Sequence, residues 1–396
     1  MDSSNISDFD YHLPEELIAQ RPLEQRSDAR LLVFEKGKIL DRKFSELPEL
    51  LPDNTQLVLN NTQVINARII MFRESGARVE LFLLAPLKPK SMEEAMISES
   101  ECIWTALVGG GKRWKEGESL SLDADGLKLS AKRLVHHGTH SEVAFSWDEV
   151  QGNFGELLEK LGRVPLPPYM NREVEEADPE RYQTTYAEIQ GSVAAPTAGL
   201  HYTKEILEEM RSKGISLEKV TLHVGAGTFK PVSSESFKDH DMHSEHISVQ
   251  RSTIEALAAH KGLRVAVGTT SLRTLESLYW LAVAKYHGRL QNKVEQWDPY
   301  ELEDVFSSYS EALNYLLEQA GDASVLNTAT ALMIVPSYSV KSIDGITTNF
   351  HLPKSTLLLL VSAMIREDWI RVYGHATANR YRFLSYGDTS LLWKNK

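Results

Sequence analysis

Short apolar segments alternate with longer amphipathic segments through most of the second half of the chain. The short segments are rich in Val, Leu and Ile, which is typical of strands buried in a sheet, whereas the longer ones repeat their apolar residues with the period of a helix. Because helices return the chain between strands, we predict a largely parallel, twisted α/β sheet. The expected strands are residues 30–34, 56–60, 219–224, 264–267 and 331–335, and the expected helices are residues 13–21, 204–213, 252–261 and 272–280.

Residues 67–150 follow a different pattern, in which short alternating segments are separated by glycine-rich or charged turns without intervening helices. Such a pattern predicts a small antiparallel β-barrel. Residues 85–99 are expected to leave it as an exposed hairpin. We therefore predict two domains, a discontinuous α/β domain of residues 1–66 and 151–396 and an inserted barrel of residues 67–150. The barrel strands are expected at residues 78–84, 102–108, 126–129 and 142–145.

The segment Thr347–Thr356 is polar and runs directly into the apolar residues Leu357–Val361. Pro353 suits the first turn of a helix, because it lacks an N–H and fixes φ. We expect that helix to be anchored in the core by its leucines and to present the polar segment to a ligand. A capped helix with a polar loop is the alternative. Residues 295–320 are acidic and aromatic, and we expect one helix there.

Three further turns place small and polar residues after apolar segments, at 191–203, 221–229 and 267–273. The first contains His201 and the helix cap Thr203, and the third carries Arg273 one turn into a helix. The second contains a Gly-x-Gly but lacks the full dinucleotide fingerprint, and the third lacks the Gly-Lys-Ser/Thr ending of a phosphate-binding loop. Since ligands bind at the carboxyl ends of such strands, we expect these turns to share one cleft.

The segment His240–His246 holds three histidines, with Glu245 among them. A metal site is one interpretation, although neither His-Glu-x-x-His nor a cysteine partner occurs. Acid–base residues in a cleft and a plain surface loop are the other two. His243 and Glu245 suit the second, because an imidazole and a carboxylate can divide proton removal and delivery. We expect no bound metal.

Composition narrows the class of protein further. The 396 residues include 42% hydrophobic and 25% charged residues, which is ordinary for a globular enzyme, and a single cysteine excludes an internal disulfide. The beginning of the chain does not resemble a signal peptide and no run is long enough to span a bilayer, so we expect a cytoplasmic protein. A net charge of −12 argues against a general nucleic-acid coat protein. A polyanion could still dock at Arg366, Arg371, Arg380 and Arg382, but charge alone favours the alternative that these arginines form a solvated helix face.

Nearly the whole chain resembles the S-adenosylmethionine:tRNA ribosyltransferase-isomerase family of queuosine biosynthesis. The resemblance rests on the turns and histidine segment above, together with the segments at residues 9–23, 57–68, 181–184, 347–356 and 381–388. The chain differs from the family in two places: Pro336-Ser337-Tyr338 stands where the family has Pro-Gly-Tyr, and residues 281–327 are longer.

This resemblance implies an α/β domain with an inserted barrel. It also implies transfer and isomerisation of the ribosyl group of S-adenosylmethionine onto 7-aminomethyl-7-deazaguanine at the wobble position of a tRNA. The products are the epoxyqueuosine base, adenine and methionine. S-Adenosylmethionine is then a consumed co-substrate, no permanently bound cofactor is expected, and tRNA is the partner of a monomeric enzyme.

Such a reaction needs a base beside the sulfonium, an acid for adenine and donors for the ribose hydroxyls. Glu245 or His243 is the expected base, and Arg273 is expected to bind the methionine carboxylate. The remaining candidates are His201, His223 and His351 for adenine or ribose; Thr269, Thr270 and Ser355 as hydroxyl donors; Arg382 or Lys354 for the tRNA backbone; and Thr197, Thr203, Thr228, Asn349 and Asp388 as further substrate contacts.

Two other functions fit parts of the pattern. The barrel could be the platform of a non-catalytic RNA-binding protein, with Trp104, Trp114 and Trp147 stacking on bases. An S-adenosylmethionine-dependent methyltransferase is the other alternative, but the chain has no Gly-x-Gly loop after a first core strand.

Overall fold

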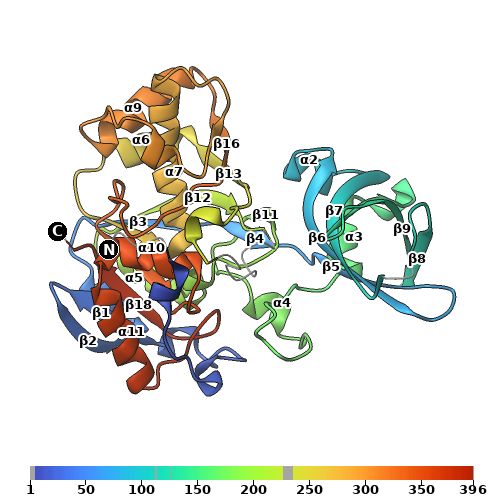
Figure 1. The fold of residues 1–396 in the computed structure, drawn as a ribbon, viewed down its shortest axis with the longest axis horizontal. Helices are drawn as coiled ribbons and strands as arrows, with labels where there is room; N and C mark the ends of the chain where they lie inside the picture. The colour runs from blue at the N-terminus through green and yellow to red at the C-terminus, as the bar shows by residue number, and fades with distance from the viewer. Residues whose placement is uncertain (1–4, 112–113, 125, 226–234, 396) are drawn as a thin grey trace.

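The computed structural model describes residues 5–111, 114–124, 126–225 and 235–395, and its architecture is a large mixed sheet beside a closed barrel (Figure 1). The sheet has ten strands, and its central strands β12, β3, β14 and β17 are parallel to one another. The predicted, largely parallel α/β fold with a barrel is therefore confirmed. In spatial order the strands are β15 (Lys293–Val294), β16 (Val325–Thr330), β13 (Glu245–Gln250), β12 (Ser216–His223), β3 (Gln56–Asn60), β14 (Arg264–Val267), β17 (Gly345–Asn349), β18 (Thr389–Trp393), β1 (Arg30–Glu35) and β2 (Lys38–Lys43).

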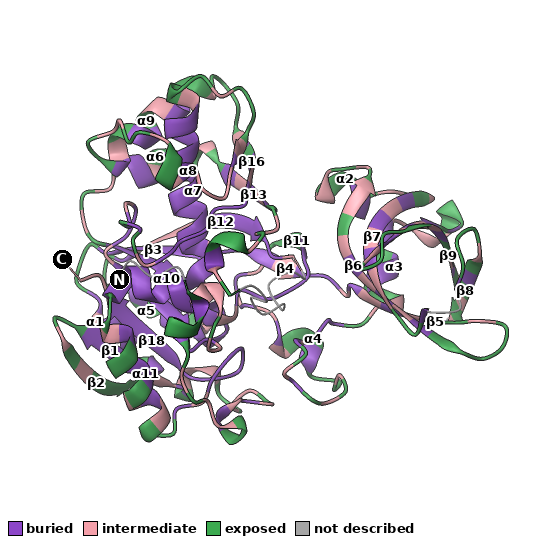
Figure 2. Cartoon of the chain, viewed as in Figure 1, coloured by how far each residue is buried: buried purple, intermediate pink, exposed green. Residues whose placement is uncertain are grey.

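Both faces of the sheet are covered by helices, because alternate residues of its central strands belong to different cores. Val58 of β3 packs in the core formed with α7, whereas its neighbours Leu57 and Leu59 pack in the core formed with α5. Buried residues consequently run through the middle of the sheet (Figure 2). The main helices are α5 (Lys204–Ser212), α6 (Arg251–Ala259), α7 (Gly268–Tyr286), α9 (Tyr309–Gln319), α10 (Thr356–Ile365) and α11 (Asp368–Ala378).

The barrel closes through six antiparallel strands in the order β10-β7-β6-β5-β8-β9. Its core includes Trp104, Trp114 and Trp147, which are all buried, together with Phe154 of α3 (Phe154–Leu161). The three tryptophans are therefore unavailable for stacking on bases. The strands are β5 (Arg68–Phe72), β6 (Arg78–Lys88), β7 (Glu101–Gly109), β8 (Ser119–Ala124), β9 (Leu127–His136) and β10 (Ser141–Ser146).

A short two-stranded ribbon, β4 (Thr62–Val64) paired with β11 (Ile189–Ser192), lies between the sheet and the barrel (Figure 1). Residues 85–99, predicted as an exposed hairpin, extend from the barrel toward the sheet. They consist of the end of β6 and a short helix α2 (Met92–Met96), in which Ala95 and Met96 are buried. Helix α2 contacts β11. No helix among the described residues is long and apolar enough to cross a bilayer.

Several predicted elements are wrong in detail. Residues 331–335 form no strand, because the β13–β16 ladder ends at the pair Glu245 and Thr330. The expected helix at residues 13–21 is a single 3-10 turn, Glu15–Leu17. The insertion holds two helices, α8 (Asp298–Glu301) and α9, instead of one.

Two local geometries also differ from expectation. Helix α10 begins at Thr356 with Ser355 as its N-cap, so Pro353 precedes the helix, and Lys354 adopts a φ of 54°. Residues 268–271 belong to α7, which begins at Gly268 with a φ of 83° that favours glycine. Ser337, where the family has glycine, does not adopt a positive φ, so the substitution introduces no backbone strain there.

Candidate active site

Two adjoining pockets lie where the carboxyl ends of β12, β14 and β17 meet the start of α10. They share the lining residues Val224, Thr269, Thr270, Thr356 and Leu357, so together they form one cleft. Its position is that of ligand sites in open α/β sheets. One half is lined mainly by residues of the 194–198 turn and of the segment that runs from the end of β17 into α10, and the other by the 240–245 segment and α7. The predicted gathering of the polar turns in one place is seen for these segments.

A buried carboxylate, a guanidinium and an imidazole meet in the second half of the cleft. Glu245 is 3% exposed, and its Oε2 accepts a hydrogen bond from Nη1 of Arg273. Its Oε1 lies 3.3 Å from Nε2 of His243 and accepts a hydrogen bond from the Gly225 N–H. Burial alone would raise the pKa of Glu245, but Arg273 and His243 hold it well below its usual range. Glu245 is therefore a charged partner with both oxygens occupied.

His243 is the exposed member of this triad. A third of its side chain is accessible, against 1% for Glu245. Because a carboxylate can only accept, the contact at 3.3 Å places the proton of neutral His243 on Nε2 and leaves the lone pair on Nδ1. The arrangement orients an imidazole whose free nitrogen can take up a proton.

Arg273 retains donors beyond its bond to Glu245. Its Nε and Nη2 atoms are buried without a hydrogen-bond partner among the described residues, and the buried Oγ1 of Thr270 is also unpartnered. Both residues line the cleft. Buried unpaired donors are costly, so these groups are suited to an acceptor brought by a ligand, such as a carboxylate or a hydroxyl.

The first half of the cleft is more apolar, and several of its polar side chains already form hydrogen bonds with one another. Thr197 donates to Oδ1 of Asn349 at 2.9 Å, and His351 Nε2 lies 2.9 Å from Oγ1 of Thr348. Burial lowers the pKa of His351 to about 3, so its imidazole is neutral and cannot serve as a cationic acid near neutral pH. Tyr169 also lines this half and shares a 2.6 Å hydrogen bond with Ser385.

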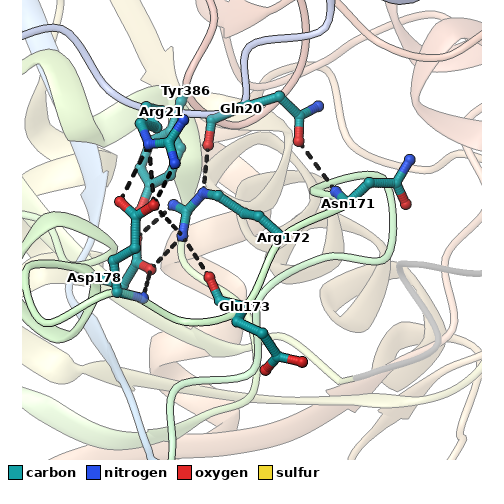
Figure 3. A network of polar contacts seen from close by, with 8 residues as sticks. Gln20, Arg21, Asn171, Arg172, Glu173, Asp178 and Tyr386 are labelled. Carbon is teal, nitrogen blue, oxygen red and sulfur yellow. Dashed lines mark hydrogen bonds and ion pairs between the residues drawn. The ribbon is translucent and has the colours of Figure 1, made fainter.

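Arg172 lies at the centre of a polar network with Gln20 and Asp178 (Figure 3). Arg172 makes a bidentate ion pair with Asp178, with both N···O distances 2.7 Å, and donates through Nε to the carbonyl of Gln20. The side chain of Gln20 in turn contacts the backbone of Tyr169 and Asn171. The network therefore positions one wall of the cleft.

The structure places His201, His223 and Thr203 away from the cleft. His201 packs against Phe44 and lies 3.3 Å from the Arg26 carbonyl, and burial lowers its pKa to about 4. His223 faces His246 on the neighbouring strand. Thr203 caps α5 by accepting from the Ile206 N–H.

The remaining candidates have mainly structural contacts. Lys354 is half-exposed and pairs with Asp10 at 2.7 Å, and Asp388 accepts from the backbone N–H groups of Arg30 and Arg382. Arg382 also donates to the carbonyl of Arg21. Ser355 lines the cleft, but its hydroxyl caps α10. Thr228 lies outside the described residues.

Sequence reasoning missed several lining residues. Tyr169, Tyr182 and Ser385 line the first half, whereas Met333 and Ile334 line the second. Tyr182 lies in the segment 181–184, which carries part of the family resemblance, so it could have been proposed as a site residue from the sequence. Tyr169 could not, because its place in the cleft depends on the hydrogen-bond network around Arg172.

The chain is similar in sequence to known proteins over almost its full length. The model of the family described as a queuosine biosynthesis protein matches residues 6–392. A Treponema denticola protein named S-adenosylmethionine:tRNA ribosyltransferase-isomerase is 38% identical, with 97% of this chain and 99% of that protein covered. Proteins of the same name from Azoarcus and Desulfitobacterium hafniense are 39% and 40% identical, and each match covers at least 98% of both chains.

A crystal structure of S-adenosylmethionine tRNA ribosyltransferase from Thermotoga maritima matches with 30% identity and a TM-score of 0.47, covering 97% of this chain and 99% of that one. The family model matches almost the full length of the chain, and three relatives share 38–40% of its residues. The chain belongs to the queuosine biosynthesis protein family.

Proposed function

We propose that this chain is an S-adenosylmethionine:tRNA ribosyltransferase-isomerase. It transfers the ribosyl group of S-adenosylmethionine to 7-aminomethyl-7-deazaguanine at the tRNA wobble position and isomerises it, giving epoxyqueuosine, adenine and methionine. The family membership supports this reaction. The observation that carries it is the triad of His243, Glu245 and Arg273 in a cleft at the carboxyl ends of the sheet.

We assign the base to His243 and not to Glu245. The sulfonium acidifies the carbon beside it, so an imidazole held in the correct tautomer can remove the proton from that carbon and form an ylide. Nδ1 of His243 accepts the proton, while Glu245 keeps the ring oriented and stabilises the imidazolium that results. Glu245 itself is poorly suited, because its depressed pKa makes it a weak base.

The unpartnered groups of the cleft are assigned to substrate. Nε and Nη2 of Arg273 bind the methionine carboxylate, and Thr270 donates to a ribose hydroxyl. The more apolar half, with Tyr169 and Tyr182, receives a planar base. His351 stays neutral and contributes hydrogen bonds only.

The test is incubation of the full chain with S-adenosylmethionine and a tRNA carrying the aminomethyl-deazaguanine base, followed by mass spectrometry of the nucleosides. The expected result is the mass gain of a ribosyl-derived epoxide and tRNA-dependent release of adenine. A methyl mass gain with S-adenosylhomocysteine would identify a methyltransferase instead. Binding of tRNA without any product would identify a non-catalytic binder, and either result would overturn the proposal.

A further inference from the structure

Outside the cleft, three metal-ligating side chains from different parts of the fold come together. Glu93 lies on α2, His223 at the end of β12, and His246 on β13. One ligand atom from each lies within 4.8 Å of the other two. None of the three residues lines either half of the cleft.

The strand register brings the two histidines side by side. His223 and His246 are directly paired in the antiparallel β12–β13 ladder, and their rings lie at an interplanar angle of 12° with centroids 6.1 Å apart. Cross-strand neighbours of this kind present their side chains on the same face. This register also separates His246 from His243, so the histidines that are clustered in the sequence serve different places.

Each imidazole has a buried nitrogen without a hydrogen-bond partner among the described residues. His223 is 5% exposed, and its Nδ1 lies 2.8 Å from Oγ1 of Thr62, while its buried Nε2 makes no hydrogen bond with any of these residues. Nδ1 of His246 is buried and lacks a partner in the same part of the chain. Two buried lone pairs or N–H groups left unsatisfied are costly, and a shared ligand would remove both penalties.

The protonation states suit a cation. Burial lowers the pKa of His223 to about 4 and also lowers that of His246, so both imidazoles are neutral. Partial burial would raise the pKa of Glu93, but hydrogen bonds from the Ser91 hydroxyl and from its own backbone N–H keep it below its usual value. Neutral imidazole and charged carboxylate are the forms that bind metal ions without first losing a proton.

We propose that Glu93, His223 and His246 bind a divalent transition-metal ion of the Zn²⁺ type, which fastens α2 of the barrel to the β12–β13 pair of the large sheet. Two nitrogens and one carboxylate oxygen are a ligand set that zinc accepts, with water in the fourth position. Thr62 would orient His223 through Nδ1, in the manner of the outer hydrogen bonds found around metal-bound histidines.

The ligand atoms need only a small adjustment. Tetrahedral coordination requires ligand atoms about 3.3 Å apart, and Glu93 is exposed, so its side chain can move toward the two histidines. The ion would be a structural link and not a reagent, because it is bound away from the His243 triad.

The experiment measures metal in the full-length protein after treatment with EDTA, reloading with ZnCl₂ and exhaustive dialysis. We expect about one bound zinc ion more in the wild type than in His246→Gln or Glu93→Gln, and replacement by Co²⁺ to give visible absorption bands of a tetrahedral site. Zinc should raise the melting temperature of the wild type and leave that of the two variants unchanged.

His137→Gln is the matched control, because His137 also contacts a carboxylate, that of Glu142 at 2.9 Å, but belongs to no three-ligand group formed by the residues that the structure describes. It should retain the zinc of the wild type. Equal zinc content in the wild type and Glu93→Gln would overturn the proposal, as would failure of the wild type to retain zinc. Glu93 is at the surface, so its variant keeps the test valid even if His246→Gln folds poorly.

Discussion

In the pair of His243 and Glu245, the carboxylate supplies a buried negative charge and the imidazole supplies a nitrogen that can accept a proton. Glu245 is buried and held charged by Arg273, while His243 is partly exposed and keeps a free nitrogen. A carboxylate alone in this place would be too weak a base, and an imidazole alone would lack a fixed tautomer. The geometry therefore favours His243 for proton transfer.

His243→Asn should lower the rate of adenine release by about 10²–10⁴-fold, because that is the usual contribution of a positioned base. The affinity for S-adenosylmethionine should change little, since the assigned carboxylate and ribose donors remain. Single-turnover kinetics and equilibrium binding measure the two quantities. His240→Asn, at a neighbouring lining position, is the control. A near-normal rate in His243→Asn would remove His243 from the mechanism and leave Glu245 as the base.

Arg273→Lys tests the free guanidinium donors. Lysine keeps a positive charge near Glu245. It lacks the planar guanidinium group, whose Nε and Nη2 atoms are available to bind a ligand in the wild type. We expect the KM for S-adenosylmethionine to rise by about tenfold to hundredfold, which corresponds to the loss of a hydrogen bond to a charged group. The matched variant is Arg289→Lys, whose ion pair with Asp298 lies outside the cleft. An unchanged KM in Arg273→Lys would show that the methionine carboxylate binds elsewhere.

At the scale of elements, α7 joins the cleft to the insertion. Its first turns carry Thr270 and Arg273, and its later turns pack against α9, where Tyr309 donates to the Leu275 carbonyl at 3.0 Å. The buried Leu313 of α9 belongs to the same core. The acidic insertion therefore covers the helix that supplies cleft residues.

Leu313→Ala should lower the free energy of unfolding by about 2–5 kcal/mol, because it removes a fully buried side chain and leaves a cavity. Below the melting transition the KM for S-adenosylmethionine should stay close to that of the wild type. Thermal unfolding and steady-state kinetics provide the two measurements. Leu290→Ala, at a position that is 92% exposed, should leave the melting temperature almost unchanged. Similar shifts in both variants would contradict the proposed packing role of α9.

The Arg172–Asp178 network should make stability depend on pH. Burial would raise the pKa of Asp178, but the bidentate bond from Arg172 lowers it below the ordinary value of about 3.9. The unfolded state therefore binds a proton at higher pH than the folded state, so the stabilisation is present above about pH 5 and is lost as the pH falls below about 4.

The expected observation is a melting temperature of Asp178→Asn that lies below that of the wild type at neutral pH, with a difference that shrinks as the solution is acidified. Asp368→Asn removes an exposed ion pair with Arg371 and should have little effect at any pH. A difference for Asp178→Asn that stays constant down to pH values of about 3 would contradict the assignment of a low pKa to this carboxyl group.

The apolar pattern predicted strands with an apolar centre, such as β3 and β14, but it also predicted a strand at residues 331–335 that does not form, and it missed a buried strand that is polar. Strands β3 and β14 were predicted within a residue of their bounds. Strand β17 was missed, because Thr347 and Thr348 are polar yet fully buried. Their groups are satisfied by distant partners: the Thr348 carbonyl accepts from Thr389, and Thr347 contacts the hydroxyl of Tyr202. Such partners cannot be recognised from a local pattern.

At the scale of the whole molecule, the sequence predicted which turns carry polar chemistry but not which of them face one another. Thr270, Arg273 and His243 gather in one cleft, whereas His201 lies beside Phe44 and His223 lies against β13. The difference depends on strand order and register, which bring together residues far apart in the chain. The same applies to Glu93, which reaches His223 only because the barrel extends α2 toward the sheet.

Strand β13 separates two sites with neighbouring residues. Glu245 lies toward Arg273 and the cleft, and His246 lies toward His223, because successive side chains of a strand point to opposite faces. One additional residue between His243 and Glu245 would turn the carboxylate toward His223 and leave Arg273 without its partner. The alternation of side chains along the six-residue strand β13 thus decides which of these residues faces the cleft and which faces the second group of histidines.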